Sequence, residues 1–365
     1  MKIPLTEVYV DDAVREAALR VLDSGWFVKS QENAGLEKEF AAYVGARHAV
    51  TVSSGTAALY LALQALGVRP RDEVLVPSFS FIATVTPLLQ LGAKPVFVDI
   101  DRETFNIDPD LARRKVTKRT RGMLPVHLYG HPADLGPLAD LADDADLWML
   151  EDACQAHGAQ YRGRHVGTFG DAATFSFFPS KNMTVCGDGG AVVTNRVDIA
   201  DRVRMLTDAG RKPGDKYLHQ VVAGNYRLSE LHAAIGRVQL SYLPQWIDAR
   251  RRVAADYTNR LSTISGVRPP VEREGCAHSY YVYTIRARRR DKLAAHLAAS
   301  GIATGLYYPT PIHRQPAVPA VYRRAKLPET DRAAREVLSL PIHPRLAAEA
   351  VRQVAEAVGA FYAGA

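Results

Sequence analysis

The 365-residue sequence predicts an α/β fold with a parallel sheet and a second, smaller domain. Short apolar segments, typical of buried strands, are separated by stretches of helical character; they are 72–77, 94–100, 122–127 and 147–152. Parallel strands need crossover connections, which are usually helices, so this alternation indicates a parallel sheet.

The pattern of predicted helices and strands changes after the segment 266–270. Residues 231–246 carry apolar side chains at helical spacing and continue into the basic stretch 248–261, which predicts one long connecting helix. A strand candidate at 280–286 and helix candidates at 292–300 and 347–362 follow. We therefore expect two domains, residues 1–246 and 247–365.

The first functional signal follows the strand expected at 47–52. Ser54, Gly55 and Thr56 precede an apolar block of helix formers that ends at Gly67. This pattern predicts a buried helix whose N-terminus is capped by Ser54 or Thr56. Free backbone N–H groups at a helix start, beside small hydroxyl side chains, suit a phosphate dianion. Taken alone, the segment is more typical of an ordinary cap without a ligand.

Two carboxylates, Glu151 and Asp152, follow the apolar run 147–150. Carboxylates just past a buried strand lie at the sheet edge where α/β folds bind their ligands. An aspartate there can keep the ring nitrogen of a pyridine cofactor protonated. It can equally cap a following helix, and both interpretations stay open.

Lys181 stands between the aromatic run 175–179 and the glycine-rich turn 187–190, which leads into the apolar segment 191–194. That setting predicts an amine held inside a site, where it can act as a nucleophile. A Schiff base to pyridoxal 5'-phosphate (PLP) is the commonest use of such a lysine.

In this order, the segments 54–56, 151–158, 175–182 and 187–190 resemble the DegT-type sugar aminotransferases, which are PLP enzymes of fold type I. Further matches cover nearly the whole chain; they are 95–99, 125–130, 224–228, 307–309 and 338–341. The resemblance implies a large domain with a mostly parallel seven-stranded sheet flanked by helices, and a smaller α+β C-terminal domain.

The resemblance also implies roles for individual cofactor contacts. Lys181 matches the Schiff-base lysine, Asp152 the acid at the pyridine nitrogen, and Gln155 the side chain near the cofactor's O3'. Phe81 matches the aromatic that stacks on the pyridine ring, with core packing as the alternative. The expected phosphate contacts are Ser54, Gly55, Thr56, the N–H of Ala57, and Ser176.

Asn225 matches an asparagine that reaches the cofactor phosphate of the neighbouring subunit. The resemblance therefore implies a homodimer with shared active sites. Tyr307, Tyr308 and His313 lie in a proline-rich, stiff segment and are expected to bind sugar hydroxyls, while Arg227 meets a phosphate. For each tyrosine, packing at the domain junction is an equally open alternative.

These expectations describe ping-pong transamination in aminosugar or antibiotic biosynthesis, from an amino acid, expected to be glutamate, to a nucleotide-linked ketosugar. The turn 187–190 and Lys216, Tyr217 and His219 more closely resemble members that aminate carbon 3 than carbon 4. Three alternatives stay open: a cyclitol aminotransferase, a dehydratase, and a PLP-fold regulatory protein without turnover. Lys181 argues against the dehydratase, because those members carry histidine there.

The composition, with 47% hydrophobic and 23% charged residues, is ordinary for a soluble globular protein. Three cysteines without a CxxC pair indicate free thiols in a reducing cytoplasm. The net charge of +7 comes mostly from scattered arginines, and the tight runs 250–252 and 288–290 are typical of solvated faces. We therefore expect attraction of anionic nucleotide-sugars and no nucleic-acid partner. No signal peptide, membrane span or metal site is expected.

Overall fold

The computed structural model describes residues 2–212 and 214–364. Its centre is a seven-stranded sheet with the strand order β1-β9-β8-β5-β4-β2-β3. These strands are β1 (His48–Val52), β2 (Glu73–Pro77), β3 (Lys94–Val98), β4 (Thr120–Met123), β5 (Trp148–Asp152), β8 (Ala172–Ser176) and β9 (Gly190–Thr194). The neighbours from β8 to β3 are parallel, and β9 is antiparallel to both β8 and β1. The predicted mostly parallel seven-stranded sheet is confirmed.

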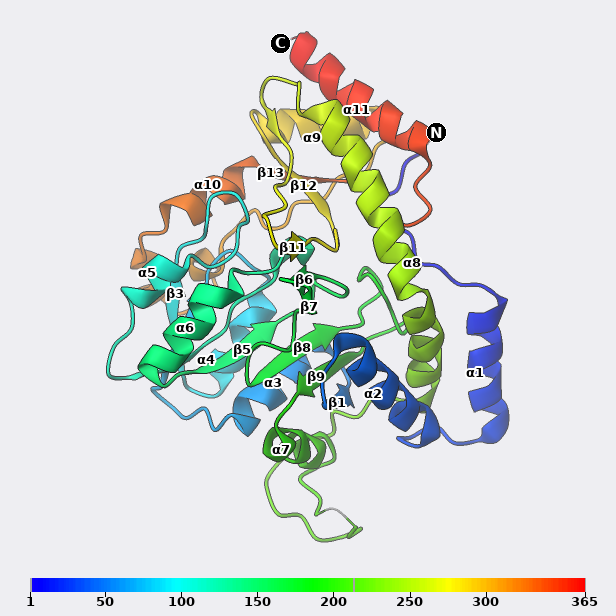
Figure 1. Cartoon of the computed structure of the whole chain (residues 1–365), viewed down its shortest axis with the longest axis vertical. Helices are drawn as coiled ribbons and strands as arrows, with labels where there is room; N and C mark the ends of the chain where they lie inside the picture. The colour runs from blue at the N-terminus through cyan, green and yellow to red at the C-terminus, as the bar shows by residue number, and fades with distance from the viewer. Residues whose placement is uncertain (1, 213, 365) are drawn as a thin grey trace.

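Helices cover both faces of this sheet (Figure 1). One face packs against α3 (Gly55–Ala65), α4 (Thr86–Gln90) and α7 (Val197–Thr207). The other face packs against α2 (Gln31–Val44), α6 (Leu135–Ala145) and the first half of α8 (Glu230–Leu261). Outside these layers lie α1 (Asp12–Ser24), which packs along α8, and α5 (Pro109–Arg113), which packs on α6.

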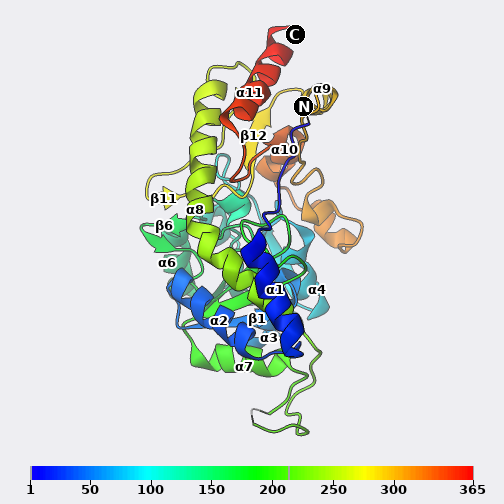
Figure 2. The same cartoon turned by 90° about the vertical axis from the view of Figure 1, so that its right-hand side faces the viewer.

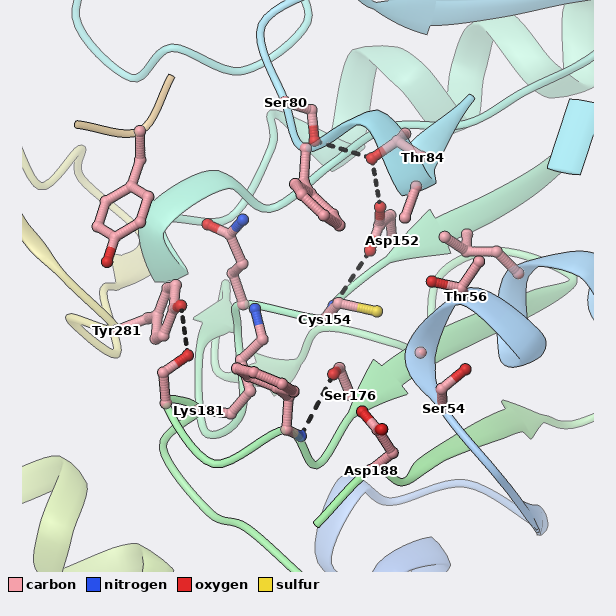
Figure 3. A pocket seen from close by; sticks show the side chains of 18 of the residues that line it. Ser54, Thr56, Ser80, Thr84, Asp152, Cys154, Ser176, Lys181, Asp188 and Tyr281 are labelled. Carbon is pink, nitrogen blue, oxygen red and sulfur yellow. Dashed lines mark hydrogen bonds between the residues drawn. The ribbon is translucent and has the colours of Figure 1, made fainter. Parts of the chain in front are cut away.

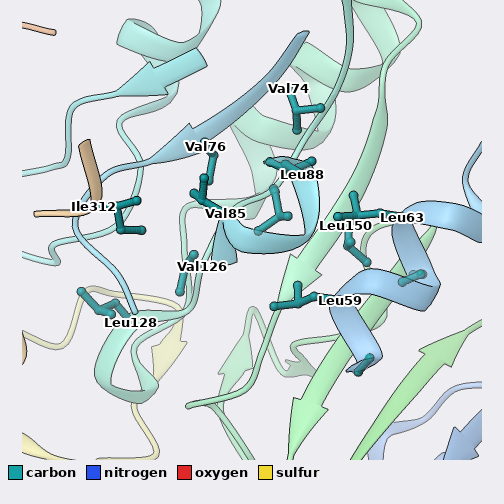
Figure 4. Packing of buried hydrophobic residues seen from close by; sticks show 14 of the residues in the cluster. Leu59, Leu63, Val74, Val76, Val85, Leu88, Val126, Leu128, Leu150 and Ile312 are labelled. Atoms are coloured by element: carbon teal, nitrogen blue, oxygen red, sulfur yellow. The ribbon is translucent and has the colours of Figure 1, made fainter. Parts of the chain in front are cut away.

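Side-chain alternation along the strands divides the core into these two layers. In β2, Val74 and Val76 belong to the layer with α3 (Figure 4). Leu75, between them, belongs to the opposite layer. In β5, Met149 and Leu150 divide in the same way. Because successive strand residues point to opposite faces, Asp152 shares the α3 side with Leu150.

The C-terminal part is built on a three-stranded sheet with the order β10-β12-β13. Its elements are β10 (Val267–Arg268), β12 (Tyr283–Ala287), β13 (Val337–Leu340), α9 (Arg290–Ala299), α10 (Pro328–Glu336) and α11 (Ala348–Ala363). The second half of α8 packs into the core of this part through Ala254, Tyr257 and Leu261. Residue 246 lies inside α8, so the division into 1–246 and 247–365 stays a prediction.

A third, small sheet joins distant parts of the sequence. It pairs β6 (Gln160–Tyr161) with β7 (Arg164–His165) and with β11 (Cys276–Ala277). At the far end of the molecule from α11, the segment between α7 and α8 projects from the body (Figures 1 and 2). Among the described residues, no helix combines the length and the apolar character needed to cross a membrane.

Candidate active site

A pocket of about 530 Å³ opens where β5 and β8 end and α3 begins (Figure 3). Its size is within the range of roughly 300–1,000 Å³ typical of small-molecule sites. The strand ends supply Asp152 and Ser176, and the loop after β8 supplies Lys181. The carboxyl ends of parallel strands meet at one sheet edge, which is why segments far apart in sequence converge here.

The N-terminus of α3 forms one end of the pocket. Ser54 caps this helix, because its Oγ accepts a hydrogen bond of 3.0 Å from the N–H of Ala57. A Cβ on Gly55 would lie 2.7 Å from the Cβ of Ser176, so only glycine lets the helix start approach the end of β8 this closely. The hydroxyls of Ser54, Thr56 and Ser176 therefore line the pocket around a helix N-terminus, which suits a phosphate.

Asp152 lies on the pocket wall, 5% exposed, and its carboxylate is held by two donors. Thr84 Oγ1 donates to Oδ2 at 2.9 Å, and the N–H of Cys154 donates to Oδ1 at 3.2 Å. Ser80 Oγ lies 2.8 Å from Thr84 Oγ1 and extends this chain of hydroxyls. No helix begins after Asp152, since residues 153–158 form turns, so the capping alternative is not realised.

The strand end that carries Asp152 is anchored from the opposite face by Glu151. This fully buried carboxylate accepts hydrogen bonds from His127 Nε2 at 3.0 Å and from the N–H groups of Gly167, Phe169 and Gly170. Burial alone raises the pKa of Glu151, but these donors outweigh it and lower the pKa. The charged carboxylate thus fixes the backbone from which Asp152 projects.

Lys181 reaches the pocket beside an aromatic ring from the C-terminal part. Its Nζ lies 4.4 Å from the ring centroid of Tyr281, a distance typical of a cation–π contact. The Tyr281 hydroxyl lies 3.1 Å from Ser180 Oγ, next to the lysine in sequence. Tyr281 therefore contacts both the amine and the loop that carries it.

Phe81, Gln155 and Tyr308 form a further side of the pocket. Gln155 Nε2 donates to the Tyr308 hydroxyl at 3.0 Å, and its Oε1 accepts from the N–H of Tyr129 at 2.9 Å. Phe81 is 52% exposed, which excludes the core-packing alternative, and its ring centroid lies 5.9 Å from that of Tyr308. An exposed ring on a pocket wall is free to stack on a planar ligand.

Tyr307 and Tyr308 both line the pocket, and both also pack against the core layer that contains α3. Burial and the nearby Tyr281 raise the pKa of each of the two hydroxyls. Both hydroxyls therefore remain protonated at neutral pH and can donate hydrogen bonds to a ligand.

Four of the predicted site residues do not line this pocket. Ala57 lies in the first turn of α3, and its N–H already serves the Ser54 cap. Asn225 is exposed in the projecting segment, and Arg227 there forms an ion pair with Asp208. His313 is fully buried, and its Nδ1 lies 2.7 Å from Ser78 Oγ. The short helix Ile312–Arg314 turns His313 toward the end of β2, so the structure does not bring it to the substrate side.

Sequence reasoning missed several residues that the structure brings to the pocket. Thr84 and Ser80 support Asp152, and Tyr281 and Ser180 accompany Lys181. The hydroxyl-rich segment Ser78–Thr86 was a usable signal, because it directly follows a buried strand. Tyr281 had no such signal, since it stands among other aromatic residues of a strand-like segment.

These residues fit PLP. A helix N-terminus with three hydroxyls suits its phosphate, a buried carboxylate faces the pocket where a pyridine nitrogen needs a partner, and the amine of Lys181 lines the same pocket. The close approach of the helix start to the end of β8, which Gly55 allows, brings Ser176 to the same cradle.

Comparison with known proteins agrees with this geometry. The model of the DegT/DnrJ/EryC1/StrS aminotransferase family matches residues 9–359. The chain belongs to this family. It is therefore a PLP-dependent enzyme of a sugar aminotransferase family, with the fold-type I architecture.

Relatives and solved structures cover nearly the whole chain. A dTDP-3-amino-3,4,6-trideoxy-alpha-D-glucose transaminase of Streptomyces venezuelae is 45% identical over 94% of this chain and 90% of its own length. A pleiotropic regulatory protein of Geobacillus stearothermophilus is 44% identical over 99% of both chains. The crystal structure of S. venezuelae DesV in complex with a ketimine intermediate superposes with a TM-score of 0.95, at 42% identity over 99% of this chain and 98% of that one.

Proposed function

We propose that this enzyme moves the amino group of an amino acid, with glutamate as the expected donor, to carbon 3 of a nucleotide-linked ketosugar. The observation that carries the proposal is the convergence of Lys181, Asp152 and the hydroxyl-lined start of α3 on one pocket. The names of relatives support the substrate class. They include the dTDP-sugar transaminase described above and, at 37% identity, a UDP-2-acetamido-2-deoxy-3-oxo-D-glucuronate aminotransferase of Pseudomonas aeruginosa.

PLP, when bound, supplies an electrophilic carbon and an electron sink for the donor's bonding electrons. The N-terminus of α3, with Ser54, Thr56 and Ser176, binds its phosphate in this proposal. Asp152, oriented by Thr84 and Cys154, holds the proton at the ring nitrogen. The Nζ of Lys181 would hold the cofactor in the pocket and would carry a proton as general acid and base.

The remaining walls of the pocket suit a sugar. Tyr307 and Tyr308 offer protonated hydroxyls, and Ser180 and Asp188 add further polar groups. Phe178, which is 49% exposed at the pocket, offers an apolar surface for a sugar face. Among the described residues, Lys181 is the single cationic side chain that lines the pocket. Side chains that would bind the diphosphate of a nucleotide must therefore come from residues outside the lining.

A homodimer with shared active sites meets that requirement. The projecting segment carries Lys212, Lys216 and Asn225, all exposed. It also exposes large apolar side chains, with Tyr217 at 81% and Val222 at 99%. Exposed apolar side chains on a projecting segment are typical of an interface, which supports docking of this segment on a second copy of the chain.

Separate half-reactions test the activity. Protein incubated with glutamate should change its cofactor absorbance once per site, and a ketosugar should reverse the change. Borohydride should trap the cofactor on Lys181, and Lys181→Ala should abolish both half-reactions. A Lys181→Ala variant with native turnover would refute the central role of the lysine.

A panel of dTDP-, UDP- and GDP-linked 3-keto and 4-keto sugars, with a free cyclic ketone beside them, tests the substrate. The proposal expects the fastest reaction with a nucleotide-linked 3-keto sugar. Preference for the free cyclic ketone would instead support a cyclitol aminotransferase. The relative described as a pleiotropic regulatory protein gives a second candidate function, regulation without turnover. Absence of both half-reactions in cofactor-loaded protein would favour that candidate.

Complementation tests the shared site. Lys181→Ala and Asn225→Ala chains should each be impaired alone. A mixed dimer places both lesions in one site and leaves the other site wild type, so mixing should restore part of the activity. No rescue after verified subunit exchange, or an active monomer, would contradict the shared site.

A further inference from the structure

A second hollow lies between the segment after β3 and the small C-terminal sheet. Its volume is about 180 Å³, and its lining includes Arg102, Glu103 and Phe105 on one side and Arg268, Pro269 and Arg286 on the other. None of these residues lines the pocket of Lys181. The hollow is therefore separate from the site described above, and its lining is rich in arginine.

Two of these arginines carry charge without a partner. Arg102 and Arg268 are exposed, and neither forms an ion pair within 4.0 Å in the part of the chain that the structure describes. The acidic residue of the lining, Glu103, lies 3.6 Å from Arg273, so a cation outside the hollow already faces its carboxylate. The charge balance of the hollow thus favours an anion.

The third arginine, Arg286, is buried and held in place. It is 8% exposed, its Nη1 donates to Glu336 at 2.8 Å, and its Nη2 donates to the carbonyl of Arg102 at 2.7 Å. Its Cζ lies 4.7 Å from the ring centroid of Phe105. Its Nε, however, is buried and donates to no acceptor among the described residues. That atom is too enclosed to reach a ligand in the hollow, and Glu336 together with Glu329, 3.9 Å from Nη2, offsets the charge of Arg286. Arg286 therefore holds the segment of Arg102 in place and does not bind the ligand itself.

We propose that this hollow binds a phosphate group between the guanidinium groups of Arg102 and Arg268, on a wall that Arg286 holds in place. Guanidinium groups suit phosphate oxygens because they present several N–H donors in a plane. The apolar walls from Phe105 and Pro269 limit solvent screening and strengthen the attraction. The volume is below the roughly 300–1,000 Å³ of sites that enclose a whole ligand. The hollow therefore takes free phosphate or the phosphate end of a larger molecule.

The position of the site gives the ligand a structural effect. Arg102 follows a strand of the large sheet, whereas Arg268 belongs to the three-stranded sheet of the C-terminal part, which comes after α8 in the sequence. A phosphate held by both ties these two parts of the chain together. Binding of the phosphate should therefore be saturable, and it should raise the thermal stability of the protein. The inference does not depend on the sugar substrate.

The experiment uses cofactor-loaded enzyme reduced with borohydride, so that the cofactor's own phosphate occupies the α3 cradle. Inorganic phosphate is titrated at low ionic strength and binding is measured by calorimetry. Arg102→Gln and Arg268→Gln each remove one charged donor. Arg323→Gln is the matched control, because Arg323 is also exposed and lies outside the lining of the hollow. Glycerol 3-phosphate in a parallel titration distinguishes free phosphate from the phosphate end of an organic molecule.

The expected result is saturable binding that weakens at least about tenfold in both Arg102→Gln and Arg268→Gln and is unchanged in Arg323→Gln. That factor corresponds to one lost hydrogen bond to a charged group. Tighter binding of glycerol 3-phosphate would assign the site to an organic phosphate, and tighter binding of inorganic phosphate to the free ion. Absence of saturable binding, equal weakening in all three variants, or dependence on only one of the two arginines would overturn the proposal.

Discussion

Thr84→Val should slow the glutamate half-reaction because it removes one of two donors that orient Asp152. The Thr84 hydroxyl donates to Asp152 Oδ2 at 2.9 Å, and the two residues are 1% and 5% exposed, so water has little access to replace it. A hydrogen bond to a charged group contributes about 1.5–3 kcal/mol. If that contribution is made to the transition state, the rate falls about 10- to 150-fold.

The assay is a single-turnover reaction with glutamate, followed by the cofactor's absorbance. Thr86→Val is the matched control, because the Thr86 hydroxyl donates to the carbonyl of Ile82 and does not contact Asp152. Thr84→Ser keeps the hydroxyl and should restore most of the rate. If Thr84→Val and Thr86→Val react at the same rate, the orientation of Asp152 does not depend on Thr84 and the reasoning is wrong.

Three further predictions concern the electron sink, the lysine and the pH dependence of stability. Asp152→Asn should keep the fold, checked by circular dichroism, and lose on the order of 100-fold or more in the half-reaction rate; full activity would contradict its role. Tyr281→Leu should slow capture of PLP by the apo-protein about two- to thirtyfold, measured by absorbance, whereas Tyr281→Phe keeps the ring and should stay near the native rate; equal rates in the two variants would count against the cation–π contact. Burial, with a smaller contribution from Lys181, lowers the pKa of His157 to about 3, so the unfolded chain binds this proton more tightly and stability is lost as pH falls below about 6.5. Between pH 7.5 and 5.5 the free energy of unfolding, measured by urea denaturation, should fall by about 1.4 kcal/mol more in the native protein than in His157→Phe. An equal fall in the two proteins would refute this.

Three of the chemistry-bearing residues that the sequence predicts share one property: each has a local signature in the neighbouring residues of the chain. Ser54 precedes an apolar helix, Asp152 ends an apolar strand, and Lys181 stands before a glycine-rich turn. Such signatures depend only on neighbouring residues of the chain, so they can be recognised without knowledge of the tertiary structure. The strand predicted at 122–127 was the least accurate in its bounds, since β4 ends at Met123. Pro125, which has no N–H to donate, follows shortly after that end.

Residues whose placement depends on packing could not be predicted in this way. Thr84 meets Asp152 across 68 positions of sequence, and Tyr281 meets Ser180 across 101. His313 is the opposite case: the sequence places it at the substrate, but the structure does not place it in the lining of the pocket. The prolines around it predict a stiff segment, but stiffness does not decide which way a side chain points. Its neighbour Ser78, at the end of β2, accepts the backbone N–H of His313 and lies against its ring, and this pairing directs the imidazole inward.

Arg250 shows how the C-terminal part contributes to the site without entering it. The run 250–252 was expected to be a solvated face, and for Arg250 that expectation is wrong, since it is 2% exposed. Burial lowers its pKa to about 10, which still leaves the guanidinium charged at neutral pH. Its Nη1 lies within hydrogen-bonding distance of the carbonyls of Tyr280, Tyr281 and Ile342, at 3.2, 3.3 and 3.2 Å. Helix α8 therefore holds the backbone of Tyr281, and Tyr281 in turn contacts the amine of Lys181. The long helix thus fixes the position of a ring beside the amine of Lys181, so it supports the candidate site as well as joining the two parts of the chain.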